Sequence, residues 1–498
     1  MIGLLFFITF TILTLAILFI LAPLKTIFWY KSKGFPTYFF PILGEIYAEH
    51  KRFQTKGDTL SRAKEFTRDF PNQKVLVTNL GNKPLVSLND SLYIKEFLLK
   101  PHLYEKAGIT KFVHPLVGGG GLVMSEGDVW KRHRKIISNS FHYESLKANI
   151  STIRNTTLEF LNKTTPEECQ NYSAIQKIQE ITGEIVGRIF FGENLNSYTI
   201  EGKPLTLFLA ALVSDMTMSA LSPLSLILGE KALKYPVFKV YRDLNKRIAT
   251  FREVCFQIVE DHKKSGRKGH DLLSSLLATQ DSPDPELRLS DKEIVDEFIT
   301  FFIAGMDTTG HLIGMALYNL TQHPEELEKL KAEIATTYDK DENPTTDTLQ
   351  TMDELHNVLK ETLRMYTPAP MTFFRVALVD HKIGELEIKK GTWVRPFFIS
   401  VFFDEKHFSN PEQFNPSRWK DPAGKLDAHA FTPFSAGPRN CLGQHLAIVE
   451  SKIIVAEFLK KFDFKLKERY KLKMQMRFLY EPSEDLIFEL TPKSEEIL

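Results

Sequence analysis

The sequence predicts a mainly helical fold with small β-sheets, built as one large globular domain. Long segments with helical hydrophobic periodicity fill most of the chain, and short strand-like runs such as KVLVTNL, KPLVSL, GTWVRPFF and LIFEL lie near both ends. Hydrophobic residues make up 43% of the 498 residues, which is ample for a core, and no repeat or low-complexity block divides the chain. We therefore expect a single domain over residues 45–498.

Charge and cysteine content exclude two classes of protein. Lys and Arg number 63 against 62 Asp and Glu, so the net charge of +1 gives no reason to expect a nucleic-acid partner. The cysteines Cys169, Cys255 and Cys441 are too few and too scattered for a disulfide framework. The sequence thus predicts a reducing compartment for the domain, with Cys169 and Cys255 as buried free thiols.

The first segment of the chain is apolar. Ile2–Ala22 is uncharged and reaches the roughly 20 residues that cross a bilayer core. A cleaved signal peptide is the alternative, but no charged n-region precedes the run and no small-residue cleavage site follows it. Lysines follow at Lys25, Lys31 and Lys33, so the positive-inside rule places the rest of the chain in the cytosol. We expect a transmembrane anchor over residues 1–24.

A Pro/Gly-rich connecting segment is predicted over residues 25–44. Gly34, Pro36, Pro41 and Gly44 interrupt regular structure there. We expect a stiff connection between the anchor and the domain.

Two predicted helices carry polar motifs in apolar surroundings. The helix from Asp291 to about Gln322 is apolar on nearly every face in its middle, yet contains AGMDTTG. Such a helix is expected to pass through the centre of the fold. A second helix, from about Met352 to Tyr366, contains KETLR, which places a glutamate and an arginine three residues apart on one face before TPAP ends it.

Cys441 lies in FSAGPRNCLG, residues 434–443, ahead of a predicted helix. A structural thiol does not need the surrounding glycines, a zinc site needs further ligands, and a catalytic thiol needs a base that His445 is not placed to supply. A thiolate ligand of haem iron needs a cysteine on a tight loop, with backbone N–H groups and a helix N-terminus near the sulfur. The loop and the following helix supply these features.

The same loop carries a family resemblance. Phe434, Gly437, Arg439, Cys441 and Gly443 resemble, position by position, the haem-binding signature of the cytochrome P-450 superfamily. AGMDTTG resembles the family's oxygen-activation motif, ETLR its Glu-x-x-Arg motif, and FNPSRW the segment that supplies a further arginine. All four motifs follow the family's order along the chain.

The resemblance spans about Gly34 to Leu490 and is sharp from Phe301 onward. In the first half of the chain GDVWKRHRK is its best marker. It implies the cytochrome P-450 fold, with haem b between the long central helix and the loop of Cys441, which is the axial ligand of the iron. The other implied cofactor-binding residues are Trp130, Arg134, Ala304, Arg375, Phe434, Arg439 and Gly443.

Residue roles follow from the same resemblance. Asp307 and Thr308 match the acid and alcohol pair that delivers protons in the family, and Gly305 with Thr308 is expected to loosen the helix and open a groove. The run Gly118–Leu122 lacks a following Gly-Lys-Ser/Thr and is interpreted as a flexible loop rather than a phosphate site. A buried structural cluster is expected from Glu361, Arg364 and Arg418.

The implied function is monooxygenation, in which one atom of O2 enters a lipophilic organic substrate. The chain has no flavin or nicotinamide fingerprint, so an NADPH-dependent flavoprotein reductase is the implied electron donor, and KRHRK at Lys131–Lys135 offers a docking patch. The implied location is the endoplasmic reticulum membrane, single-pass, with the catalytic domain facing the cytosol. Two alternatives stay open: a haem-thiolate isomerase or dehydratase acting on a peroxide, and a non-enzymatic haem sensor.

Overall fold

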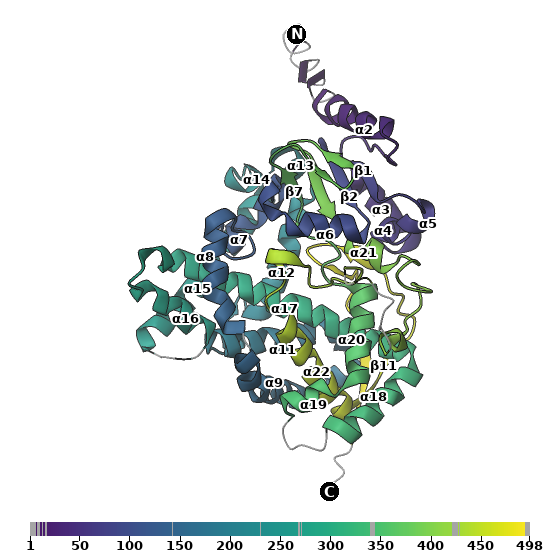
Figure 1. Cartoon of the computed structure of the whole chain (residues 1–498). Helices are drawn as coiled ribbons and strands as arrows, with labels where there is room; N and C mark the ends of the chain where they lie inside the picture. The colour runs from purple at the N-terminus through teal and green to yellow at the C-terminus, as the bar shows by residue number, and fades with distance from the viewer. Residues whose placement is uncertain are drawn as a thin grey trace.

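The computed structural model describes residues 17–493 except 142, 230, 267–268, 270, 339–343, 421–426 and 428, together with residues 6, 10–11 and 13–14. It has a mostly helical body with its largest sheet at one side, and α2 projects from the body on that side (Figure 1). The predicted mainly helical fold with small sheets is therefore confirmed.

The helices and strands have the following bounds. The α-helices are α2 (Ala22–Ser32), α3 (Glu45–Lys56), α4 (Ser61–Lys64), α5 (Phe66–Asp69), α6 (Ser91–Leu99), α7 (His114–Val117), α8 (Gly127–Ser138), α9 (Tyr143–Asn162), α10 (Pro166–Gln170), α11 (Ala174–Val186), α12 (Leu205–Ala220), α13 (Pro223–Leu228), α14 (Lys231–Lys234), α15 (Lys239–Ser265), α16 (Leu272–Ala278), α17 (Asp291–Gln322), α18 (Pro324–Thr337), α19 (Thr346–Gln350), α20 (Asp353–Tyr366), α21 (Phe398–Phe402) and α22 (Gln444–Lys461). The strands are β1 (Val75–Leu80), β2 (Lys83–Leu88), β3 (Tyr104–Lys106), β4 (Tyr172–Ser173), β5 (Thr199–Ile200), β6 (Lys203–Pro204), β7 (Arg375–Ala377), β8 (His381–Ile383), β9 (Leu386–Ile388), β10 (Trp393–Pro396), β11 (Phe462–Leu466), β12 (Met474–Met476), β13 (Tyr480–Pro482) and β14 (Ile487–Pro492).

The largest sheet joins the two ends of the domain. Its strand order is β1-β2-β10-β7-β3, so strands from the first quarter of the chain pair with strands that follow α20. β10 runs parallel to β2, with Val394 opposite Val86, and antiparallel to β7, with Val394 opposite Arg375. β7 pairs in turn with β3, and this pairing brings basic residues of the two strands side by side.

The long helix α17 begins with a capping box, in which Ser290 and Glu293 bond each other's backbone N–H groups, and it runs unbroken to Gln322. It lies in the middle of the helical body in Figure 1, beside α11. Its side chains are buried on most faces, which explains why its apolar pattern is not confined to one stripe.

Glycines let α11 and α17 approach closely. A Cβ at Gly305 would lie 2.5 Å from Val186 Cγ2, and one at Gly314 would lie 2.7 Å from Ile175 Cγ1. Gly305 therefore serves the packing of the two helices, and α17 shows no break there. The expectation that Gly305 loosens the helix is corrected, because its missing side chain faces α11.

The run Gly118–Leu122 is also corrected. A Cβ at Gly118 would lie 1.9 Å from the carboxylate of Asp296 on α17, and Gly120 N–H donates to the same carboxylate at 3.3 Å. Arg252 on α15 donates to Asp296 at 2.7 Å and to a carbonyl of α7. The run is a packed connection in which glycines allow contact with α17.

The connecting segment is attached to the sheet. Helix α2 continues to Ser32, so helical structure includes the first residues of the predicted irregular segment 25–44. After it, Tyr38 N–H donates to Val77 O at 2.9 Å, and the Arg62 guanidinium lies 5.0 Å from the ring of Tyr38. The segment is therefore held by β1 and by an arginine of α4.

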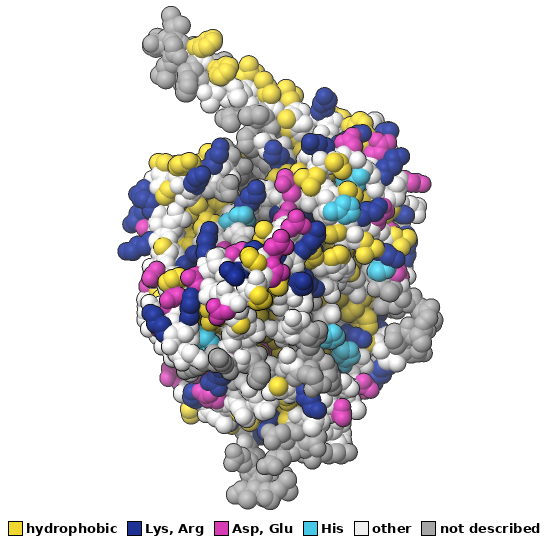
Figure 2. Space-filling model, turned by 60° about the vertical axis from the view of Figure 1, so that its left-hand side comes forward, with side chains coloured by type: hydrophobic (Ala, Val, Ile, Leu, Met, Phe, Trp, Pro, Cys, Tyr) yellow, Lys and Arg dark blue, Asp and Glu magenta, His cyan; other side chains and the backbone are white. Residues whose placement is uncertain are grey.

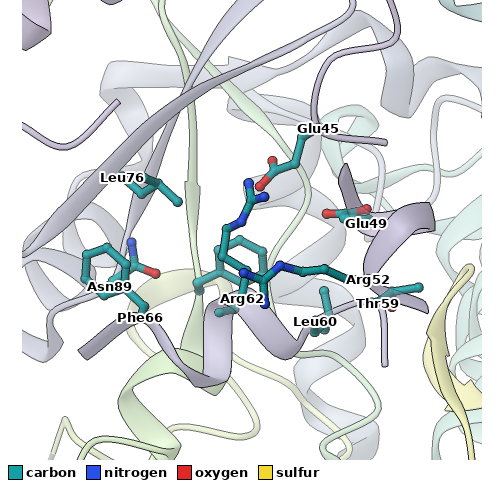
Figure 3. Close-up of a pocket in the computed structure, with 11 residues that line it drawn as sticks. Glu45, Glu49, Arg52, Thr59, Leu60, Arg62, Phe66, Leu76 and Asn89 are labelled. Carbon is teal, nitrogen blue, oxygen red and sulfur yellow. The ribbon is translucent and has the colours of Figure 1, made fainter. Parts of the chain in front are cut away.

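A small cavity of about 20 Å³ lies between α3, α4 and the sheet (Figure 3). Glu45, Glu49, Arg52 and Arg62 turn toward it, and Arg395 of β10 pairs with Glu45 from the sheet. Burial, together with the neighbouring charge of Glu45, raises the pKa of Glu49 to about 8. The mutual contacts of this charged cluster tie α3 and α4 to the sheet.

The predicted membrane segment Ile2–Ala22 lies largely outside the described residues. Among the helices that are described, none has the length and apolarity needed to cross a bilayer.

Candidate active site

The Cys441 loop is a tight turn ahead of α22. Cys441 N–H donates to Phe434 O at 3.0 Å, and Asn440 N–H donates to Gly437 O at 3.1 Å. Gly437 has a φ of +72°, and a Cβ there would lie 2.7 Å from Leu98 O. The loop therefore needs glycine at 437 for its own turn and for contact with α6.

The Cys441 thiol has one open face and one enclosed face. The residue is exposed, although protein atoms surround much of the sulfur. Burial raises the pKa of the thiol, and the N–H of Gly443 and the guanidinium of Arg134 oppose that rise. Cys169 and Cys255 are buried free thiols, so among the described cysteines only Cys441 has an open face.

Arg134 links α8 to the same loop. Its guanidinium donates to Asn440 O at 2.8 Å and to Asn440 Oδ1 at 2.7 Å. Two bonds to the residue before Cys441 fix the position of the loop against α8. Sequence reasoning missed Asn440, whose amide has no marker in the motif.

A cluster of cations lies beside the loop. The Arg439 guanidinium stacks 4.1 Å from the ring centre of Trp130 and donates to Ser125 O at 2.9 Å. Arg375 donates to Glu126 Oε1 at 2.7 Å, and Lys106 Nζ lies 3.1 Å from the same oxygen. The structure thus brings Trp130, Arg375 and Arg439 together, as the resemblance implied.

The charges of this cluster fit a bound dianion. Three cations, Lys106, Arg375 and Arg439, face one carboxylate, Glu126, and Arg439 Nε is buried without a hydrogen-bond partner among the described residues. Burial and the nearby Arg375 lower the pKa of Lys106 to about 7 and that of Arg439 to about 10. Carboxylates such as the two propionates of haem would relieve this excess positive charge.

Lys106 and Glu126 were not predicted from the sequence. Lys106 is a single basic residue in β3, and only the pairing of β3 with β7 brings it close to Arg375. Glu126 precedes α8 and accepts from Lys106 N–H at 3.0 Å as well as from two side chains. No local pattern distinguishes either residue from a solvent-exposed charge.

The middle of α17 presents two different faces. Ala304 is exposed and Thr308 is half-buried, although Ile303, Met306, Asp307 and Thr309 are buried. Thr308 Oγ1 donates to Ala304 O at 2.7 Å, which keeps the hydroxyl on this open side of the helix. Phe301, one turn before Ala304, packs on Phe141 with 5.5 Å between the ring centres. Gly443 of the Cys441 loop also lies beside Phe141.

Asp307 lies on another side of α17 from Thr308, because consecutive helical residues point about 100° apart. Its carboxylate accepts from Gln179 Nε2 at 2.5 Å and lies 3.4 Å from His311 Nδ1. Burial raises the pKa of Asp307 to about 6, with the charge of His311 acting in the opposite direction. The acid and the alcohol are thus adjacent in sequence but face different surroundings.

Glu361, Arg364 and Arg418 come together in a buried cluster. Arg364 donates to both oxygens of Glu361 at 2.9 and 3.0 Å, and Arg418 Nε donates to Glu361 Oε1 at 2.9 Å. Trp419 Nε1 donates to the other oxygen at 3.0 Å. The side chains of Glu361 and Arg364 are 0% exposed, so this i, i+3 pair is not a surface pair.

The extent of the basic patch is corrected. Within KRHRK, Lys131 and Lys135 are exposed, but His133 is buried against Glu297 and Arg134 points to the Cys441 loop. Arg132 pairs with Glu293 of α17. Helical geometry divides the five residues between the surface and the interior, which leaves two of them on the outer face.

Residues 37–487 match the protein family described as Cytochrome P450. The chain is 30% identical to Cytochrome P450 709B1 of Arabidopsis thaliana over 77% of this chain and 75% of that protein. It is 28% identical to echinocystic acid 23-monooxygenase of Saponaria officinalis over 78% of this chain and 76% of that protein. It is also 27% identical to Cytochrome P450 3A1 of Rattus norvegicus over 84% of each chain. The chain therefore belongs to the cytochrome P450 family of haem-thiolate monooxygenases.

Proposed function

We propose that this chain is a membrane-anchored monooxygenase that inserts one oxygen atom of O2 into a lipophilic organic substrate. Its electrons come from an NADPH-dependent flavoprotein reductase. The observation that carries the proposal is the joint position of an exposed Cys441 and a cation cluster with excess positive charge. A thiolate and a group of cations are what a haem with two propionates requires.

Haem b would be held by residues of four segments. Cys441 supplies the iron ligand, and Trp130, Arg134, Arg375 and Arg439 bind or surround the propionates. The half-buried Phe434 shields the sulfur, while Ala304 and Gly443 allow close approach to the ring. When bound, the haem supplies the activation of dioxygen, and the protein supplies its binding, its orientation and the proton path.

Asp307 and Thr308 have different parts in proton transfer. Thr308 Oγ1 stands on the open side of α17 and can hold a proton or a water there. Asp307 stands on the other side, buried and with a pKa of about 6, so it can both gain and lose a proton near neutral pH. Together they would pass protons across the helix.

Thr308→Ala should separate oxygen consumption from product formation. The substitution removes the hydroxyl, keeps good helix propensity and leaves the Cys441 loop untouched. Substrate binding should persist, while product formed per NADPH falls by about tenfold and hydrogen peroxide rises, since a lost proton donor typically costs that much or more. Product and peroxide are measured with reductase, NADPH and substrate present.

Thr309→Ala is the matched control, because Thr309 is the next residue and is buried on another face. It should leave the ratio of product to peroxide near that of the unaltered protein. If Thr308→Ala and Thr309→Ala give the same ratio as the unaltered protein, Thr308 only lines the groove. The alternative of an isomerase or dehydratase acting on a peroxide predicts conversion of the peroxide without substrate-dependent O2 consumption.

The reductase would dock near α8. Lys131 and Lys135 are exposed on its outer face, and an acidic partner surface would complement them. Neutralising Lys131 and Lys135 should change the rate at which the reductase associates, and the salt dependence of that rate, more than it changes the oxidation of the substrate. The substrate is expected to be held mainly by burial of apolar surface.

The membrane anchor is proposed over residues 1–24, in the endoplasmic reticulum, with a single pass and the domain in the cytosol. Large apolar side chains project along the N-terminal extension in Figure 2, and Phe10, Leu21 and Phe28 are more than half exposed. Exposed apolar side chains on an extension favour burial in lipid.

Deletion of Ile2–Ala22 should shift the protein from the membrane fraction toward the supernatant without loss of haem. Apolar burial in the bilayer is lost, whereas the Cys441 loop and the cation cluster remain. Fractionation and the haem spectrum measure the two effects. An unchanged membrane fraction would contradict the anchor. Asn155 and Asn162 lie in Asn-x-Thr glycosylation sequons, and glycans on either residue in the native host would reverse the topology.

A further inference from the structure

A cavity of about 440 Å³ opens on the side of α17 away from Thr308. It lies between α11, α12, α17 and the β12–β13 hairpin. Asp307 and His311 form part of its wall, and Lys203, Arg477, Glu481 and Asp485 add further charge. Apolar side chains of α11 and α12 line much of the rest, and beside the charged part of its wall a cavity of this size can hold several water molecules, because each takes about 30 Å³ of liquid volume.

His311 stands between Asp307 and the hairpin. Its Nδ1 lies 2.7 Å from Asp307 O and 3.4 Å from Asp307 Oδ1, and its Nε2 lies 3.2 Å from Glu481 Oε2. Both ring nitrogens therefore face acceptors, which suits an imidazolium that donates from both sides. Glu481 is held in turn by Arg477 at 3.0 Å.

We propose that His311, held by Glu481, is a positioning residue that keeps Asp307 ionised and turned toward this cavity, and that water in the cavity supplies the protons which Asp307 passes on. The proposal rests on the function proposed for Asp307 and Thr308 and adds the outer part of the path. For each of the two protons that one turnover consumes, the Asp307 carboxylate takes a proton from cavity water and releases one toward the Thr308 side, so His311 keeps its own protons.

The charges around His311 support an imidazolium. Burial on its own lowers the pKa of His311, but the bond to Glu481 and the charge of Asp307 outweigh it and raise that pKa to about 9. The other charged groups of the cavity wall are Lys203, Arg477 and Asp485. Because the folded-state pKa lies above the ordinary value of about 6.5, the stabilisation by His311 is complete below pH 6.5 and is lost toward pH 9.

His311→Gln removes the positive charge beside Asp307. The carboxyl then loses a partner that lowers its pKa, so that pKa should rise by about one unit. The midpoint of the pH profile of product formed per NADPH should move upward by the same amount. Glu481→Gln has two opposing effects on that pKa, because it weakens the hold on the imidazolium but also removes a negative charge that raises the pKa of Asp307, so its test is the titration of His311 itself.

A second readout does not depend on turnover. The histidine Cε1 carbons are labelled for NMR spectroscopy, and the signal that His311→Gln removes is assigned to His311. We expect the pH at the midpoint of its titration to lie well above 6.5. In Glu481→Gln that midpoint should fall. A His311 midpoint at or below about 6.5 in the unaltered protein overturns the proposal, even if one of the variants fails to fold.

The matched control is His323→Gln at the end of α17. His323 Nδ1 contacts the carbonyl of the residue four positions earlier, as His311 does, at 3.0 Å from Asn319 O, but its ring packs on Phe414 at 4.9 Å. It should leave the pH profile unchanged. If His311→Gln also leaves the profile unchanged while Thr308→Ala still diverts electrons to peroxide, only this inference fails; if Thr308→Ala has no effect either, the proposed role of the acid and alcohol fails.

Discussion

Cys441→Ala should yield a protein without thiolate-ligated haem. Among the described cysteines it alone has an open face, and its loop is positioned by Arg134 and by the N-terminal end of α22. Alanine removes the sulfur while keeping the turn, which depends on Gly437 and on the bond from residue 441 N–H to Phe434 O. The reduced carbon monoxide complex should then lack the red-shifted Soret band of a thiolate ligand, and turnover should be lost entirely.

Cys169→Ala is the control for this loss. Cys169 is a buried free thiol on α10, so its removal should leave the Soret band in place. Circular dichroism of both variants checks that the helices remain. A thiolate-type band in Cys441→Ala would assign the iron ligand to another residue.

The second large effect is expected at Glu361. Glu361→Gln leaves Arg364 buried, at 0% exposure, without a full counter-charge, and it weakens the bonds from Arg418 and Trp419. Leaving one partner of a buried ion pair without its counter-charge lowers the free energy of unfolding by about 3–5 kcal/mol. The free energy of unfolding should fall by that amount, and the yield of haem-containing protein should fall with it. If unfolding is irreversible, the inactivation temperature is measured instead and should also fall.

A pair with the same helical spacing provides the comparison. Glu328 and Lys331 are three residues apart on α18, and their charged atoms lie 3.0 Å from each other. The side chain of Glu328 is 70% exposed. Glu328→Gln should change the unfolding free energy by no more than about 0.5 kcal/mol. Equal effects of the two substitutions would show that burial does not strengthen the Glu361 cluster.

Local sequence patterns were sufficient for the main elements. The long apolar run predicts α17, which spans Asp291–Gln322, and KETLR before TPAP predicts α20, which spans Asp353–Tyr366. Capping residues, prolines and hydrophobic periodicity act within a few residues of one another, so a single sequence carries them. The four motifs and their order likewise belong to the sequence, and they were enough for the family.

Tertiary structure decided which way the side chains of those motifs face. Gly305 meets Val186 across the α11–α17 contact, Asp307 turns toward Gln179 and His311, and Arg134 leaves the KRHRK surface for Asn440. None of these partners is close in sequence, so no local pattern could indicate them.

The cation cluster shows the same limit. Lys106 reaches Arg375 because β3 pairs with β7, although 269 positions separate the two residues in the numbering. The sequence by itself determined the helices, the motif order and the family, since these depend on short-range patterns. The excess charge beside Cys441, the buried state of Glu361 and the link from Asp307 through His311 to the cavity depend on long-range packing, which sets burial and thereby the strength of every charge interaction at the site.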